Sequence, residues 1–451
     1  MRRFLGSALS FVVLVSAGCD DTIFFPDELF RADGDLRQQL ASWGVTPIDP
    51  SPRQDPARVA LGRALFFDKI LSGNRDIACA TCHEPEAFLG DGLSLSVGTG
   101  GAGRAATRTL GAERQFVPRH APALFNAGLG LFYMFWDGRL SGFDPGTFLA
   151  LPDSIFFPEA SNILAAQAML PVLSRVEMRG NADDADVFGN PNELGALTDD
   201  QPEQIWQGIM RRLLAIPEYV AMFAAAFPDT PRSALRFQHA AEAIAAFEIE
   251  GFTATDSPLD RYIAGDEDAL SEEGERGGEL FTGEGLCITC HNGQLIGGQD
   301  FANVGAPQVG PGIGKEPPLD LGRGELDEFD FYRFAFRVPP LRNVELTAPY
   351  MHSGAYPTLE AVVDHYSDVP KAVREYDVLQ LAPGFRDSYH GDAATVSDIL
   401  SSLDFRLSET LHFSQGEKRE LVAFLRAMTD PRARDLRALV PESVPSGLPV
   451  R

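Results

Sequence analysis

The chain has 451 residues, a length that two domain-sized cores explain better than one. With 44% hydrophobic and 23% charged residues, its composition is typical of a globular protein and excludes a disordered or fibrous chain. The net charge of -26, from 64 acidic and 38 basic residues, argues against a nucleic-acid partner, because phosphate binding needs a basic surface.

The first residues predict export. Met1-Arg2-Arg3 precede a short apolar stretch over 9–15, and small residues lead into Cys19, so we expect a secretory signal over 1–19. The apolar run is too short to span a bilayer as a mature helix. Small residues before Cys19 also resemble the bacterial lipobox, although Ser16 replaces the usual Leu. We therefore expect a periplasmic protein held at a membrane by a lipid anchor alone, with cleavage of an ordinary signal as the alternative.

Helical patterns dominate the rest of the chain. Residues 20–57 contain several Pro and Asp and predict a tether or an arm that wraps around the protein. No alternation of strands and helices is visible, so we predict a mainly α fold with long irregular loops. The predicted helices cover 58–67, 204–227 with an interruption at Pro217, 233–252 and 414–428, and the predicted loops cover 98–103 and 292–328.

Four of the five cysteines form two Cys-x-x-Cys-His motifs, Cys79-Ala80-Thr81-Cys82-His83 and Cys287-Ile288-Thr289-Cys290-His291. This pattern is typical of c-type haem attachment, in which both thiols form thioethers with the haem vinyls and the histidine binds the iron. A thioredoxin-like pair would need a βαβ pattern, and a zinc site would need ligands closer in sequence. We therefore predict two covalent haems.

The two motifs lie about one domain length apart, which predicts two tandem cytochrome c-like haem domains. A polar segment over 256–274 marks the expected join. The predicted division is a signal peptide over 1–19, a tether over 20–57, an N-terminal haem domain over 58–255, a C-terminal haem domain over 256–430 and a tail over 431–451.

Three strings around the motifs resemble the bacterial diheme cytochrome c peroxidases and the MauG-type diheme oxidases. They are Leu61-Gly62-Arg63-Ala64-Leu65-Phe66-Phe67-Asp68, Phe135-Trp136-Asp137-Gly138-Arg139, and Phe336-Arg337-Val338-Pro339-Pro340-Leu341-Arg342-Asn343 with its continuation Thr347-Ala348-Pro349-Tyr350-Met351-His352-Ser353-Gly354. The resemblance implies an N-terminal haem with an open iron position for peroxide and a C-terminal haem that relays electrons.

At the first haem, the resemblance implies a distal Gln167, Pro171 and Glu177 in the family's spacing. Glu177 would act as general acid and base, and Gln167 would hold the peroxide. Trp136 would carry electrons between the haems, with ordinary aromatic packing as the alternative. The interval from Arg139 to Gln167 is longer than the family's, and residues 91–119 contain no histidine that could cap the first iron.

At the second haem, the family's sixth ligand falls on Tyr366, where peroxidases carry Met and MauG carries Tyr. Its rivals are Met351, His352 and His365. Arg342 is a further cofactor-binding residue that the resemblance implies. The family also holds calcium through an Asn and the carbonyls of a Thr and a Pro; Thr347 and Pro349 are present here, but His120 replaces the Asn, and calcium prefers oxygen ligands.

The first functional reading is a diheme peroxidase that reduces hydrogen peroxide with electrons from a small cytochrome c or copper protein; the acidic charge suits a basic donor. The second is a MauG-like oxidase that modifies tryptophan in a partner protein. The third is a diheme electron carrier without enzymatic activity.

Overall fold

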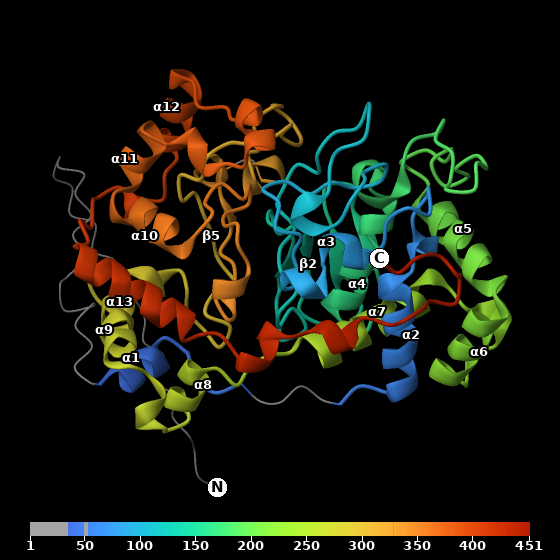
Figure 1. Ribbon diagram of the computed structural model, residues 1–451, viewed down its shortest axis with the longest axis horizontal. Helices are drawn as coiled ribbons and strands as arrows, with labels where there is room; N and C mark the ends of the chain where they lie inside the picture. Colours follow the sequence, from blue (N-terminus) through green and yellow to red (C-terminus); the bar gives the residue numbers. More distant parts are fainter. Residues whose placement is uncertain (1–34, 49–52, 328) are drawn as a thin grey trace, which may run out of the picture.

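The computed structural model of this chain describes residues 35–48, 53–327 and 329–451. The predicted signal, Cys19 and its lipid lie outside the described residues. Within the described part, none of the helices has the length and apolar character needed to cross a bilayer. Helices dominate and the strands are short, so the prediction of a mainly α fold is confirmed (Figure 1).

The helices and strands lie on two sides of the molecule, with the N-terminal haem motif on one side and α9 to α13 on the other (Figure 1). The α-helices are α1 (Leu36–Ser42), α2 (Pro56–Phe67), α3 (Cys79–Cys82), α4 (Ile163–Ala168), α5 (Pro202–Leu214), α6 (Pro217–Ala226), α7 (Phe237–Phe252), α8 (Pro258–Ile263), α9 (Glu272–Thr282), α10 (Leu359–Ser367), α11 (Val369–Arg374), α12 (Ala393–Ser401) and α13 (Gln415–Arg426). The strands are β1 (Tyr133–Met134), β2 (Leu140–Ser141), β3 (Phe148–Ala150), β4 (Ile155–Phe157), β5 (Phe301–Ala302) and β6 (Phe336–Arg337).

The first hydrophobic core forms around α2 and α7. Asp55 caps α2 by accepting hydrogen bonds from two backbone N–H groups, and Pro56 occupies the first helical position. Gly62 allows the two helices to touch, because a Cβ at this position would lie 1.8 Å from the carbonyl oxygen of Ala243. Phe66 and Phe247 then meet in this interface with ring centroids 5.5 Å apart.

The second core forms around α9 and α13. Ser414 and Glu417 make the reciprocal capping box that begins α13, which confirms the helix predicted at this end of the chain. A Cβ at Gly277 would lie 1.9 Å from the carbonyl oxygen of Glu420, so this pair of helices also packs backbone against backbone. Phe281 and Phe424 fill the interface with centroids 5.3 Å apart.

Helix α1 and the C-terminal residues each pack on the core formed mainly by the other half of the chain. The described helical part of the segment over 20–57 packs as an arm, because Leu36 and Leu40 of α1 are buried in the second core. The C-terminal residues pack on the other core: Val444 and Leu448 are buried in the first core. The Ser446 hydroxyl donates to Asp68 at 2.6 Å and anchors this tail.

The long interval between Arg139 and Gln167 contains most of a small antiparallel sheet, which the sequence did not predict. Its strand order is β1-β2-β3-β4, and Leu149 pairs with both Ser141 and Phe156. One face is buried through Leu140 and Ala150, and the other carries Phe156, which is 52% exposed. The residues between Arg139 and Gln167 are therefore ordered and pack on the first core.

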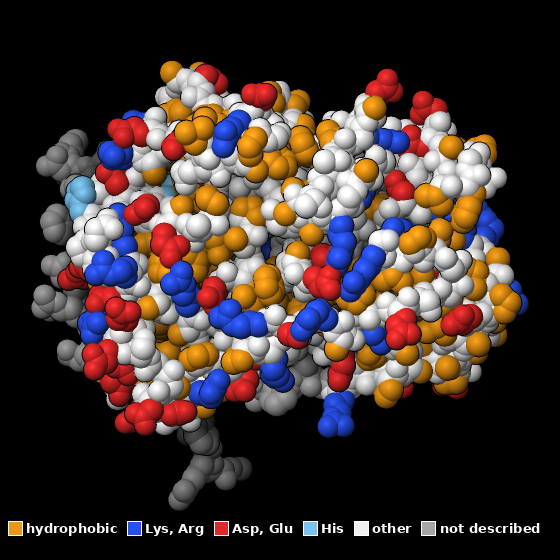
Figure 2. Space-filling view, viewed as in Figure 1, with side chains coloured by type: hydrophobic (Ala, Val, Ile, Leu, Met, Phe, Trp, Pro, Cys, Tyr) orange, Lys and Arg blue, Asp and Glu red, His pale blue; other side chains and the backbone are white. Residues whose placement is uncertain are grey.

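Charged side chains of both signs share the surface seen in Figure 2. Acidic side chains gather at the lower left of this view, over α8 and α9, and the first turn of α9 contains Glu272, Glu273 and Glu275. The C-terminal end of α9 leads into the second Cys-x-x-Cys-His motif, so this acidic group lies at the far end of the same helix, about 16 Å along its axis.

Candidate functional site

The first motif occupies the short helix α3. The Thr81 hydroxyl accepts a hydrogen bond from the backbone N–H of Ala78 at 3.0 Å, which fixes the start of the turn. His83 Nδ1 lies 3.1 Å from the carbonyl oxygen of Leu89 and donates to it, so Nε2 is left for a metal. Burial raises the pKa of the Cys79 thiol to about 12 and keeps that group neutral before modification.

The second motif forms a 3₁₀ turn over Cys287–Thr289 and repeats the same histidine arrangement. His291 Nδ1 lies 3.4 Å from the carbonyl oxygen of Ile296, which again leaves Nε2 for a metal. Burial lowers the pKa of His291 to about 4, so the imidazole is neutral and can serve as a ligand at neutral pH. The two proximal histidines are thus oriented in the same way.

A cavity of about 240 Å³ opens beside the second motif. Both thiols, His291 and Tyr366 line it. Arg337 and Arg342 line it too, and each keeps one buried guanidinium nitrogen without a hydrogen-bond partner among the described residues. Buried guanidinium nitrogens without a partner suit the two carboxylates that a haem carries, so this site fits the group.

Arg342 is held on its other side. Its Nε donates to the carbonyl oxygen of Gln294 at 2.7 Å, and a second nitrogen pairs with Asp260. The side chain is 1% exposed, so the guanidinium group has a fixed position at the cavity wall. This agrees with a role in holding the cofactor, which stays a prediction.

The predicted distal residues lie on one short segment beside the first motif. Gln167 lies on α4, and Glu177 lies on a π-helical turn over Arg175–Arg179, a rare element that often occurs at functional sites. The Glu177 carbonyl accepts a hydrogen bond from the Thr99 N–H at 2.9 Å. Gly98 permits this approach, since a Cβ there would lie 1.9 Å from the Val176 carbonyl oxygen.

Glu177 is near enough to the first motif to affect it electrostatically: its charge contributes to the raised pKa of the Cys82 thiol. Burial raises the pKa of Glu177 itself, while Arg139 and a hydrogen bond to Ser174 oppose that shift. The Gln167 side-chain amide makes no hydrogen bond to another residue in the described part of the chain, so its donor and acceptor are available to a ligand.

Trp136 lies at the wall of the second cavity. It is 9% exposed and donates from Nε1 to the His120 carbonyl at 2.8 Å. The His120 N–H donates in turn to the His352 carbonyl at 2.7 Å. The charge of His120 also affects the pKa of His83 at the first motif. The peptide around Trp136 and His120 therefore connects the surroundings of both sites.

A buried ion network that sequence reasoning missed supports this connection. Arg119 pairs with Asp137 and with Asp320, both at 2.6 Å, and all three side chains are less than a tenth exposed. The network joins segments far apart in the chain, and no local sequence pattern indicates a partner so distant in sequence. Asp137 lies next to Trp136, so the network fixes the segment that carries the indole.

The structure separates the candidate sixth ligands of the second site. His365 uses both ring nitrogens: Nε2 donates to the Val304 carbonyl at 2.7 Å, and Nδ1 accepts from the Tyr356 hydroxyl at 2.8 Å. It is absent from the residues lining the cavity, whereas Tyr366, Met351 and His352 line it. His352 also stacks on Phe336 with centroids 3.5 Å apart.

Tyr366 faces the two cysteines of its motif. Burial raises the pKa of Tyr366, and the charges of Cys290 and Cys287 add to this effect. The phenol is therefore neutral unless a bound cation draws off its proton. A ferric ion held in the cavity would supply that charge.

The residues expected to bind calcium lie at the wall of the second cavity. Thr347, Pro349 and His120 line this cavity, and the His120 imidazole donates from Nδ1 to the Leu93 carbonyl at 2.8 Å. Within the described ranges no group of three or more His, Cys, Asp or Glu side chains could hold a metal ion. A calcium ion here would therefore depend on backbone carbonyls.

Comparisons with known proteins agree with this site. The family model for di-haem cytochrome c peroxidase matches residues 56–268. The chain is 30% identical to the methylamine utilization protein MauG of Methylorubrum extorquens over 322 residues, covering 70% of this chain and 71% of that protein. It is 33% identical to the cytochrome c551 peroxidase of Pseudomonas aeruginosa over 310 residues, covering 69% and 71%.

Solved structures show the same fold. A MauG-like protein associated with microbial copper homeostasis aligns with a TM-score of 0.58 and 26% identity, covering 86% of this chain and 94% of that chain. The diheme peroxidase BthA of Burkholderia thailandensis aligns with a TM-score of 0.55 at 20% identity, covering 86% and 90%. With two haem-attachment motifs in matching environments, the chain belongs to the di-haem cytochrome c peroxidase family of oxidoreductases.

Proposed function

We propose that this protein reduces hydrogen peroxide to water at the first site, with electrons that a small cytochrome c or copper protein delivers through the second site. The observation that carries the proposal is the buried carboxyl group of Glu177, which lies beside the first motif with a raised pKa. Because burial raises its pKa, this carboxyl group takes up a proton more readily than an exposed one and can return it during the reaction. Peroxide reduction needs both transfers.

The residues have separate roles. Cys79, Cys82 and His83 hold the first haem, which supplies an iron where peroxide binds. Gln167 hydrogen-bonds the bound peroxide and orients it. The Glu177 carboxylate takes the proton from the near oxygen, and the resulting acid gives it to the leaving oxygen.

The second haem domain, over 256–430, receives the electrons in this proposal, and the first, over 58–255, uses them. Cys287, Cys290 and His291 hold the second haem, and Trp136 carries electrons between the two sites. The acidic first turn of α9, the helix that precedes the second motif, supports docking of a basic donor on this domain. We further propose that the protein works in the periplasm, with a lipid on Cys19 as its membrane anchor.

Glu177→Gln tests the proposal. The amide keeps the size of the side chain and removes its acid, so we expect peroxide cleavage to slow by about 10²- to 10⁴-fold while both haem spectra are retained. Glu218→Gln, an exposed position on α6, is the matched control. Normal turnover of reduced cytochrome c by the Glu177→Gln protein would remove this residue from the mechanism.

A second function, oxidation of tryptophan in a partner protein, is favoured by Tyr366 as the sixth ligand of the second haem. An anionic oxygen ligand stabilises oxidised iron and lowers its potential. Tyr366→Met should raise that potential and change the second haem's spectrum, and an unchanged spectrum would assign the ligand to Met351 or His352. A long-lived oxidised state with almost no cytochrome oxidation would favour this function over peroxide reduction.

A further inference from the structure

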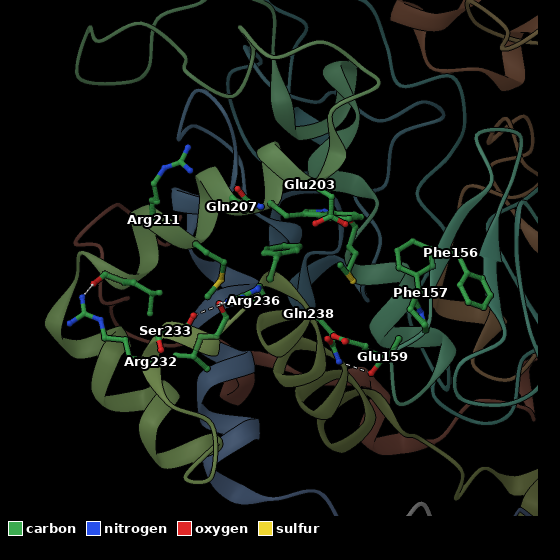
Figure 3. Close-up of a pocket in the computed structure, with 18 of the residues that line it drawn as sticks. Phe156, Phe157, Glu159, Glu203, Gln207, Arg211, Arg232, Ser233, Arg236 and Gln238 are labelled. Atoms are coloured by element: carbon green, nitrogen blue, oxygen red, sulfur yellow. Dashed lines mark hydrogen bonds between the residues drawn. The ribbon is translucent and has the colours of Figure 1, made fainter.

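A groove on the outer side of the first core takes no part in the roles assigned above. It lies between α5, the start of α7 and the segment after β4, and its volume is about 1330 Å³ (Figure 3). Glu203, Trp206, Met210 and Leu214 recur every three or four residues and place one face of α5 along it. Small-molecule pockets have volumes of about 300–1,000 Å³, so the size favours a polypeptide as the occupant.

Three arginines, Arg211, Arg232 and Arg236, line the groove. Within the described part of the chain none of them has a carboxylate oxygen within 4.0 Å. Arg232 donates instead to the Leu214 carbonyl at 2.8 Å, and Arg236 donates to the carbonyls of Ser233 and Leu235 at 3.0 Å. Glu159 and Glu203 also line the groove, so the three arginines leave it with a net positive lining. In a chain with net charge -26, such a lining favours an anionic occupant.

The groove has an apolar side opposite these charges. Figure 3 shows Arg211 and Arg232 on one side and Phe156 and Phe157 on the other. Trp206 lines the groove as well and is 6% exposed. Tryptophan, phenylalanine, methionine and arginine are the residues enriched where proteins bind each other, and tryptophan and arginine carry much of the binding energy.

The groove also borders the segment that carries Gln167. Trp206 Nε1 donates to the Met169 carbonyl at 2.9 Å, and Met169 lines the groove two residues after Gln167. An occupant would therefore lie directly behind the wall of the first site. The added sheet supplies the opposite wall through Phe156 and Phe157 of β4.

We propose that this groove docks an acidic segment of a partner protein, with carboxylates on the three arginines and one apolar side chain against Trp206 and Phe156. The inference deepens the proposed function, because it places a partner protein beside the first site, but binding itself requires no turnover. Carboxylates pair with the guanidinium fork in a way that lysine-rich or neutral segments cannot.

Three labelled peptides of about twelve residues test the proposal on the diheme holoprotein by fluorescence anisotropy. The first contains Glu and Leu in a Gly background, the second replaces Glu by Lys, and the third replaces Leu by Ser. We expect the first to bind at least tenfold more tightly than either of the others. Its affinity should fall as salt is added, since exposed charge pairs are screened.

The double variant Arg211→Gln/Arg236→Gln should bind the first peptide at least tenfold more weakly. The matched control is Arg419→Gln, an exposed arginine on α13 with no ion pair in the described ranges, which should bind as the original protein does. Circular dichroism would establish that both variants are folded. Equal binding of the three peptides, no saturable binding of the first, or an unaffected double variant would overturn the proposal.

Turnover distinguishes this proposal from the proposed function. With a small artificial reductant, peroxide reduction should be unchanged in the double arginine variant. Loss of peptide binding with normal turnover therefore supports the groove, whereas failed turnover with intact peptide binding contradicts only the peroxidase assignment.

Discussion

Replacing Gly98 by alanine perturbs the segment that carries Glu177 without touching the carboxyl group. The new Cβ would lie 1.9 Å from the Val176 carbonyl oxygen and 2.8 Å from that of Glu177, whereas real Cβ contacts do not fall below 3.0 Å. The π-helical turn must therefore move by about 1 Å. Overpacking of this kind costs about 1–3 kcal/mol of stability, and a 1 Å misplacement at a reacting site can lower the rate by about 10²-fold.

The assay is single-turnover reduction of hydrogen peroxide by the Gly98→Ala holoprotein, with thermal unfolding measured in parallel. Gly384→Ala is the matched control, because an added Cβ there meets no atom within 4 Å. We expect the Gly98 variant to lose rate and the Gly384 variant to keep it. A Gly98→Ala protein with the original rate and melting temperature would refute the claim that this glycine positions Glu177.

Three further outcomes are expected. Burial raises the pKa of Glu248 from 4.5 to about 8, so the folded state retains a proton that the unfolded state loses, and this group's contribution to stability declines between pH 4.5 and 8. Glu248→Gln should thus gain stability over the original protein, by a few kcal/mol at most and more at pH 8 than at pH 5 in urea unfolding; an equal difference at both pH values would contradict the assignment. Arg119→Met leaves Asp137 and Asp320 buried without their cation and should cost about 3–5 kcal/mol in the same assay, and a loss below 1 kcal/mol would show that water replaces it. If calcium binds the carbonyls of Thr347 and Pro349, a chelator should lower peroxide turnover and added calcium should restore it, whereas turnover indifferent to both would remove calcium from the proposal.

Features set by neighbouring residues could be predicted from the sequence. Two cysteines and a histidine within five positions define a haem attachment site, and Ser414 with Glu417 defines the start of α13 because the capping box involves only residues three apart. The helix predicted over 204–227 divides into α5 and α6 around Pro217, as proline requires. The Gln167 to Glu177 spacing located a segment that the structure places beside the first motif.

Features that depend on distant residues could not be predicted. The strands β1 to β4 have two or three residues each, too short for the alternation that identifies a strand, and their pairing stabilises them. The burial of α1 in the second core requires contact with α9 across the whole chain, for instance Leu36 against Gly278. The pairing of Arg119 with Asp320 is equally remote in sequence.

The two charged regions give the molecule two docking directions of opposite sign. The acidic first turn belongs to α9, the helix that precedes the second motif, and the arginine groove includes Met169, two residues after Gln167. A basic donor is attracted to the former and repelled by the latter, and an acidic segment behaves in the opposite way. If both proposals hold, electrons and the partner approach at different places, so adding the acidic peptide should leave the rate of reduction by a basic cytochrome c unchanged. Competition between the two would mean that both bind one surface.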